Sequence, residues 1–261
     1  MFARLARFAP RIRRTAALAA AVLLGAAARP AHAQATGVLR FDEGGQLAFT
    51  SEYGPTDVGR LRGTFLSLPG QTSASLAVDL FCVDIPHAVT FDPNGWSVYL
   101  TNLGGLPSLD YTRQGARYAD GTPDALTRYR KAAWLVDQYA RAKTVTDTAG
   151  IQGAMWRQFE SSLAPYTYAS AGEEQSVDSW LTKADTFAAS SRFDTYNWGR
   201  FTIVTDVNAA GMGDDYHGWQ ELITRTPLTT TTPEPGSIAL VAVGLAGVGA
   251  VVRRRRGAAA A

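Results

Sequence analysis

Residues 122–140 read TPDALTRYRKAAWLVDQYA, and here the hydrophobic pattern of the chain changes from the alternation of strands to the spacing of a helix. Thr122 followed by Pro123 is typical of a helix start, since proline is favoured at the first helical position. Beyond them, apolar residues recur at helical spacing and would form one face: Leu126, Tyr129, Ala133, Val136 and Ala140. We therefore expect a helix in the middle of the chain.

The sequence on both sides of this stretch completes the predicted fold. Two further helices are expected over residues 148–162, ending before Pro165, and over 176–189. Apolar and β-branched residues alternate between Gly-, Pro- and Asn-rich turns in the remaining segments, a pattern typical of strands. The predicted strands are 37–41, 47–51, 64–68, 75–83 and 96–103 before the helices, and 201–207 and 221–224 after them. This order predicts an α+β fold in which strands from both ends of the domain can share a sheet.

The C-terminus carries three features in order: Pro233-Glu234-Pro235, an apolar run over residues 238–252, and Arg253-Arg254-Arg255-Arg256. Arginine resists translocation, so we expect the basic cluster to stay on the cytoplasmic side of a membrane. As a helix, the run would be about 22 Å long, at ~1.5 Å per residue. Because this is shorter than a hydrocarbon core of ~30 Å, the segment is better suited to a transient transmembrane helix than to a permanent one.

This C-terminal arrangement resembles the PEP-CTERM sorting signal of Gram-negative bacteria. The resemblance implies recognition by an exosortase and removal of the tail. It further implies release or anchoring at the cell surface or in the extracellular matrix. Such proteins usually accompany exopolysaccharide production, so the resemblance also implies a surface or matrix role.

Residues 1–33 have the pattern of a secretory signal peptide, with a basic region followed by an Ala/Leu-rich core over residues 15–28. Ala31-His32-Ala33 offers small residues at both positions that a signal peptidase reads. Cleavage is therefore predicted between Ala33 and Gln34, after export by the Sec translocase. An N-terminal membrane helix is the alternative interpretation.

The targeting segments account for the apparent positive charge of the protein. The chain has 25 Lys and Arg against 23 Asp and Glu, but six arginines lie in residues 1–33 and four in 253–256. The remainder has 15 basic and 23 acidic groups, a net charge near −8. We predict one folded domain over residues 34–225, a Thr-rich linker over 226–232 and the sorting tail over 233–256. An acidic exported domain excludes nucleic acid as a partner, because phosphates require a basic surface.

Cys82 is the only cysteine in the chain, so this exported protein cannot form an internal disulfide. One interpretation is a buried small hydrophobic residue on a core strand, where free cysteine is common. A second comes from two short motifs: Phe81-Cys82-Val83-Asp84 near a strand end, and Ile151-Gln152-Gly153-Ala154-Met155-Trp156 on a predicted helix. With the helix at residues 129–135, these motifs resemble the thioester domains of bacterial surface adhesins over residues 75–160.

The resemblance implies an internal thioester between Cys82 and Gln152, formed with loss of ammonia and without a cofactor. An amine or hydroxyl on a surface ligand or polysaccharide would then attack the acyl carbon and become covalently attached. The protein would not be an enzyme beyond this autocatalytic step. Two positions depart from the family pattern: Ile151 stands where Thr is common, and Met155 where Ile or Val is usual.

Phe81 and Trp156 are the predicted shields of the bond against water, because Phe81 adjoins Cys82 and Trp156 lies one helical turn from Gln152. Trp156 and Phe159 also fit as core residues, which is the more frequent explanation of aromatic side chains at helical spacing. The alternative function is a non-covalent structural or binding module of an exopolysaccharide or biofilm matrix, in which Cys82 is buried and unbonded.

Two other kinds of site have partial support in the sequence. A cysteine hydrolase would pair Cys82 with His87, but residues five apart on a strand face opposite sides. Residues 206–215 have some features of a calcium loop, but Ala210 and His217 occupy positions where oxygen ligands are needed, which favours a polar turn. No metal site is predicted from the histidine spacing.

Overall fold

The computed structural model describes residues 35–51, 54–69, 75–85, 87–119, 121, 123–160, 166–167, 170–213 and 217–228. All of them belong to one compact unit, Gln34–Thr230. The predicted signal peptide with its Ala33–Gln34 cleavage site lies outside the described residues, as do Pro233-Glu234-Pro235, the membrane segment 238–252 and the arginines at 253–256. None of the helices that are described is long and apolar enough to cross a membrane.

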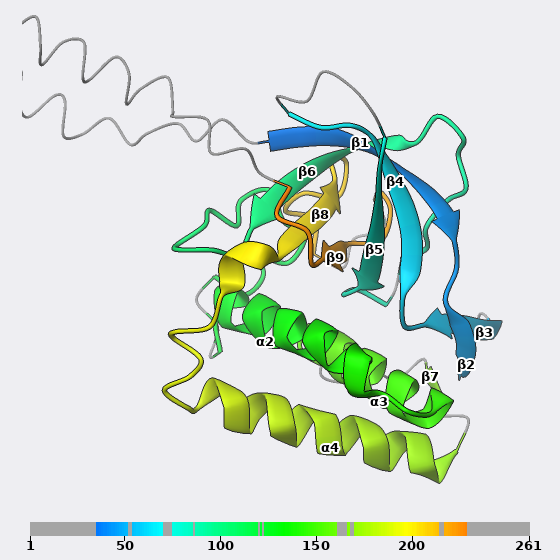
Figure 1. Cartoon of the computed structure of the whole chain (residues 1–261), viewed down its shortest axis with the longest axis vertical. Coiled ribbons are helices and arrows are strands. Elements are labelled where there is room, and N and C mark those ends of the chain that lie inside the picture. Colours follow the sequence, from blue (N-terminus) through cyan, green and yellow to red (C-terminus); the bar gives the residue numbers. More distant parts are fainter. Residues whose placement is uncertain are drawn as a thin grey trace, which may run out of the picture. The chain divides into compact units, whose positions relative to one another are not determined.

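Six strands close into an antiparallel barrel (Figure 1). In chain order they are β1 (Ala35–Glu43), β4 (Leu61–Ser67), β5 (Leu76–Cys82), β6 (Trp96–Asn102), β8 (Thr202–Asp206) and β9 (Leu222–Thr224). Around the barrel the order is β1-β4-β5-β9-β8-β6, and β6 pairs with β1 to close it. The last two strands therefore complete a barrel begun by the first four, which confirms the predicted α+β class and the shared sheet.

Alternating side chains fill the barrel. In β1, Leu39 and Phe41 are buried, whereas Arg40 between them is half-buried, because successive side chains of a strand point to opposite faces. The same alternation in the other strands builds one apolar cluster inside the barrel. Its barrel members include Leu39, Phe65, Val78, Leu80, Cys82, Val98, Leu100, Val204 and Leu222.

Three helices lie together on one side of the barrel (Figure 1): α2 (Ala125–Gln138), α3 (Val145–Trp156) and α4 (Ala171–Ala188). Each helix begins after a side chain that accepts a hydrogen bond from a first-turn N–H group. The capping residues are Asp124, Thr144 and Ser170. The pattern at 122–140 thus predicted α2 correctly, although Asp124 rather than Thr122 caps it.

Helix α3 is packed between the barrel and α4, and all of its residues from Ala149 to Trp156 are buried. It begins and ends earlier than the predicted 148–162. Thr144 caps its N-terminus, and Arg157 is its C-terminal cap. Gly150 lets the two helices approach closely, since a Cβ there would lie 2.0 Å from Ser176 Oγ of α4.

A second sheet holds β2 (Gln46–Ser51) between β3 (Gly54–Val58) and β7 (Tyr166–Thr167). The sequence did not predict β3 or β7, because GPTDV lacks an alternating apolar pattern and β7 has only two residues. Short 3₁₀ helices, η1 (Tyr139–Arg141) and η2 (Trp198–Arg200), follow α2 and precede β8.

The first residues of the predicted linker pack against the domain. Leu228 is buried in the barrel cluster, and its N–H donates to Thr202 Oγ1 at 3.3 Å. The Thr202 hydroxyl in turn donates to Thr226 O at 3.0 Å. The folded unit therefore extends at least to Leu228.

Candidate functional site at Cys82 and Gln152

Cys82 is the last residue of β5, and pairing with Leu222 of β9 holds its backbone. The thiol is buried, and its Sγ–H donates to the carbonyl oxygen of Asp84 at 3.1 Å. The indole Nε1–H of Trp156 donates to the same sulfur at 3.4 Å. The sulfur is thus fixed between the strand end and helix α3.

Gln152 is fully buried on α3, and its side chain reaches the same point of the barrel. The amide Nε2 donates to the backbone carbonyl of Cys82 at 2.7 Å, across 70 residues of sequence. The amide oxygen Oε1 accepts from the Tyr139 hydroxyl at 2.8 Å and from the Gly59 N–H at 3.4 Å. The structure therefore brings Gln152 into direct contact with Cys82, although the bond between their side chains stays a prediction.

Burial controls the ionisation of the site. It raises the pKa of the Cys82 thiol well above its usual value, and the nearby charge of Asp84 acts in the same direction. Burial likewise raises the pKa of Tyr139, with a further contribution from Cys82. Both groups are therefore protonated at neutral pH, so Cys82 is held as a thiol and Tyr139 as a hydroxyl donor.

The predicted shielding residues lie on different sides of the site. Trp156 is buried in the barrel cluster together with Cys82, which places its indole against the sulfur. The Phe81 ring belongs to the second cluster, between barrel and helices, and stacks on Tyr139 with ring centroids 4.8 Å apart. Trp156 therefore contacts the sulfur directly, whereas Phe81 meets the site through Tyr139, and shielding by either residue stays a prediction.

The sequence prediction missed Tyr139 and Gly59. Tyr139 lies in the 3₁₀ helix after α2, and Gly59 lies in the turn between β3 and β4. No local pattern marks either residue, because their role arises only when β3 and η1 meet α3. They border a pocket of about 530 Å³, whose wall also contains Phe81, Thr148 and Arg60.

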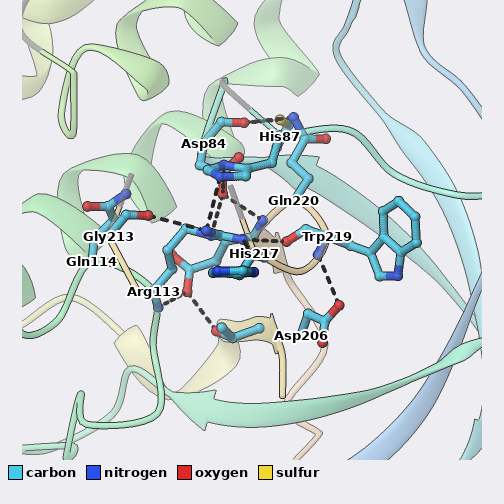
Figure 2. Close-up of polar contacts among 12 residues, drawn as sticks. Asp84, His87, Arg113, Gln114, Asp206, Gly213, His217, Trp219 and Gln220 are labelled. Carbon is cyan, nitrogen blue, oxygen red and sulfur yellow. Dashed lines mark hydrogen bonds and ion pairs between the residues drawn. The ribbon is translucent and has the colours of Figure 1, made fainter. Parts of the chain in front are cut away.

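A buried ionic cluster forms around Asp84, two residues after Cys82 (Figure 2). The Arg113 side chain is fully buried, and its Nε lies 2.9 Å from Asp84 Oδ2. His87 Nδ1 lies 3.2 Å from the same oxygen. The guanidinium also donates to the carbonyl oxygens of Gly213, His217 and Trp219 at 3.3, 2.8 and 2.9 Å. Arg113 therefore fixes Asp84, whose own carbonyl accepts the Cys82 thiol proton.

The position of His87 bears on the hydrolase alternative. Its Nε2 lies 3.1 Å from Arg113 Nη1, and a guanidinium can only donate, so Nε2 is an acceptor and Nδ1 carries the proton towards Asp84. Both ring nitrogens are thus engaged by residues other than Cys82. A thiol base needs a free acceptor nitrogen, so this geometry disfavours the Cys82–His87 pair.

Glu221 connects the ionic cluster to the helices. Its Oε1 accepts from the Arg113 backbone N–H at 2.7 Å and from Thr205 Oγ1 at 2.6 Å, and its Oε2 accepts from the Tyr129 hydroxyl at 2.6 Å. Burial is the main cause that raises the pKa of Glu221 to about 7, and the negative charge of Asp84 adds to it. The three hydrogen bonds lower the pKa, but by less than burial raises it.

We expect Glu221 to make the stability of the protein depend on pH. A carboxyl whose pKa is about 7 in the folded state and 4.5 otherwise binds a proton more tightly when folded. The protonated carboxyl therefore adds on the order of 3 kcal/mol to the free energy of unfolding. This stabilisation is fully present below about pH 4.5 and is lost as the pH rises through about 7. Urea unfolding of wild type and Glu221→Gln across this range measures it. The difference between the two should fall with rising pH, and parallel curves would contradict the assignment.

The predicted polar turn at residues 206–215 forms around Asp206. Its Oδ1 accepts from the Asn208 N–H at 2.8 Å and its Oδ2 from the Trp219 N–H at 2.9 Å, so the carboxylate closes the turn. Asp214 and Asp215 lie outside the described residues. Within the part of the chain that is described, no three His, Cys, Asp or Glu side chains are grouped so as to hold a metal ion.

A family model of the PEP-CTERM protein-sorting motif matches residues 231–256, which confirms the predicted sorting tail. No curated protein and no solved structure matches the chain. The motif marks an exported protein that is sorted by an exosortase and passes through a transient membrane-anchored step.

Proposed function

We propose that this exported protein attaches covalently to surface nucleophiles through an internal thioester between Cys82 and Gln152. Its destination is the cell surface or the extracellular matrix. The nucleophile is an amine or hydroxyl on a surface ligand or polysaccharide. The sorting signal supports the destination, and the buried site contains the cysteine and the glutamine that the bond needs.

The observation that carries the proposal is the hydrogen bond from Gln152 Nε2 to the Cys82 carbonyl, 2.7 Å long and buried. A buried glutamine side chain is costly unless it is hydrogen-bonded, and here every polar atom of the amide has a partner. The contact holds the amide beside the only cysteine of the chain. Cys82 and Gln152 are both buried and the Trp156 indole lies against the sulfur, which supports the proposal because a thioester needs protection from water to persist.

A non-covalent matrix module in the same fold is the second candidate, and one observation favours it. Burial raises the pKa of the Cys82 thiol, and structural buried cysteines with raised pKa values are usually inert. In that case Gln152 would serve packing and hydrogen bonding alone. The two candidates differ in the covalent state of the purified protein.

Amine trapping distinguishes them. Mature protein exported from cells is incubated with methylamine and analysed by peptide mapping. We expect a methylamide at Gln152 together with a newly labelled thiol at Cys82, and no adduct in Cys82→Ala. Gln158, a buried glutamine whose Nε2 donates to Ala154 O at 3.0 Å, is the internal control and should stay unmodified. Absence of the Gln152 adduct in wild type would favour the non-covalent module.

A further inference from the structure

The acyl oxygen of Gln152 is held by two donors that approach from different elements. The Tyr139 hydroxyl donates from η1 at 2.8 Å, and the Gly59 N–H donates from the β3–β4 turn at 3.4 Å. Two donors converging on one buried carbonyl oxygen are the arrangement that stabilises negative charge on that oxygen during acyl transfer.

Only glycine can place its N–H at this point. Gly59 has a φ of +86°, in the left-handed region that other residues rarely adopt. A Cβ added there would lie 2.9 Å from Thr148 Cγ2, one helical turn before Gln152 on α3. The turn is therefore fitted tightly against the helix that carries Gln152.

Both the ring orientation and the protonation state of Tyr139 are fixed by its surroundings. Phe81 stacks on its ring at 4.8 Å, which sets the direction of the hydroxyl. Burial raises the pKa of this hydroxyl, so the group remains protonated over the physiological range. A phenol in this state donates a hydrogen bond to a developing oxyanion without giving up its proton.

We propose that Tyr139 and Gly59 form an oxyanion site for Gln152, with Tyr139 as a catalytic residue of thioester formation and transfer. The inference rests on the thioester of the proposed function. In formation, Cys82 Sγ adds to Gln152 Cδ, and the carbonyl electron pair moves onto Oε1 between the two donors. The thiol proton passes to Nε2, the C–N bond breaks, ammonia leaves and the carbonyl re-forms.

Transfer uses the same oxyanion site. The attacking amine or hydroxyl adds to Cδ, charge again collects on Oε1, and the C–S bond breaks. The proton lost by the nucleophile ends on Cys82 Sγ, so the products are an amide or ester at Gln152 and a free thiol. The nucleophile would approach from the pocket of about 530 Å³, because both donors to Oε1, Gly59 and Tyr139, border it.

The test is the rate at which methylamine cleaves the preformed thioester of Tyr139→Phe. We expect the second-order rate constant to fall about a hundredfold relative to wild type, the usual effect of removing one oxyanion donor. A Tyr139→Phe protein that folds but never loses ammonia would support the same site, because formation passes through the same oxyanion. A thioester that reacts at the wild-type rate would overturn it.

Tyr129→Phe is the matched control. It removes the hydroxyl of a buried tyrosine that donates to Glu221 instead of Gln152. We expect it to lower stability but to leave the methylamine rate unchanged, and equal slowing in both variants would contradict a specific role for Tyr139.

A second readout covers the case in which Tyr139→Phe does not fold. In wild-type protein labelled with ¹³C at the glutamine side-chain carbonyl, donation from both groups should lower the thioester C=O stretching frequency. A band at the frequency of a thioester carbonyl without hydrogen bonds would overturn the proposal. Wild-type protein of full sequence mass would instead refute the thioester itself, so the two failures are distinguishable.

Discussion

Arg113→Met is expected to lower the free energy of unfolding by about 3–5 kcal/mol, because it leaves the buried carboxylate of Asp84 without its guanidinium partner. The Arg113 side chain is fully buried, and its Nε lies 2.9 Å from Asp84 Oδ2. Methionine fills a similar length but replaces none of the donated hydrogen bonds. The carbonyl oxygens of Gly213, His217 and Trp219 would then lose their donors in an interior where water does not compensate.

Urea unfolding at neutral pH measures this loss, with Arg157→Met as the control. Arg157 also forms an ion pair, 2.7 Å from Asp178, but its side chain and that of Asp178 are 30% and 62% exposed. Removing such a pair should cost less than about 1 kcal/mol. Equal losses in the two variants would show that the buried cluster does not hold the barrel end together.

Trp156→Ala should have a comparably large effect on stability and a second effect on the site. The indole is 1% exposed and belongs to the barrel cluster, so its removal leaves a cavity and should cost about 3–5 kcal/mol. The cavity would open beside Cys82 Sγ, which Trp156 Nε1 contacts at 3.4 Å. Water would then reach the sulfur, and the thioester should hydrolyse faster than in wild type.

Thermal or urea unfolding and the decay of the methylamine-reactive fraction measure these two effects. Trp219→Ala is the control, because Trp219 is 37% exposed and lies 6.3 Å from Trp96. It should lower stability much less and leave the lifetime of the thioester unchanged. If Trp156→Ala were as stable as Trp219→Ala, the indole would not be a main packing element of the barrel cluster.

The helices and most barrel strands could be predicted because their side-chain periodicity is local. The stripe from Leu126 to Val136 lies on α2, and the alternation around Leu39 lies on β1. Barrel closure could not be predicted, since it depends on β9 inserting between β5 and β8, a pairing with no signal in three residues of sequence. Strand β3 was missed because its residues carry no alternating pattern.

The candidate site was predictable only in part, for a related reason. Cys82 and Gln152 each lie in a short motif with a recognisable pattern, and the fold brings them into contact. The residues that hold Cys82 and Gln152 in place lie in no such motif. They acquire their roles from contacts with elements distant in sequence, and they are Arg113, Glu221, Gly59 and Tyr139. From the sequence alone, an arginine between Thr112 and Gln114 is expected at the surface. Arg113 is buried because the segment before β9 packs around its side chain.

The most direct measurement of the covalent proposal is the intact mass of the mature protein, purified without any amine and denatured in acid. A Cys82–Gln152 thioester predicts a mass lower than the sequence mass by one ammonia, with no thiol available to alkylation after denaturation. Cys82→Ala should show its full sequence mass. Wild-type protein of full mass with one alkylatable thiol would contradict the thioester and leave the non-covalent matrix module.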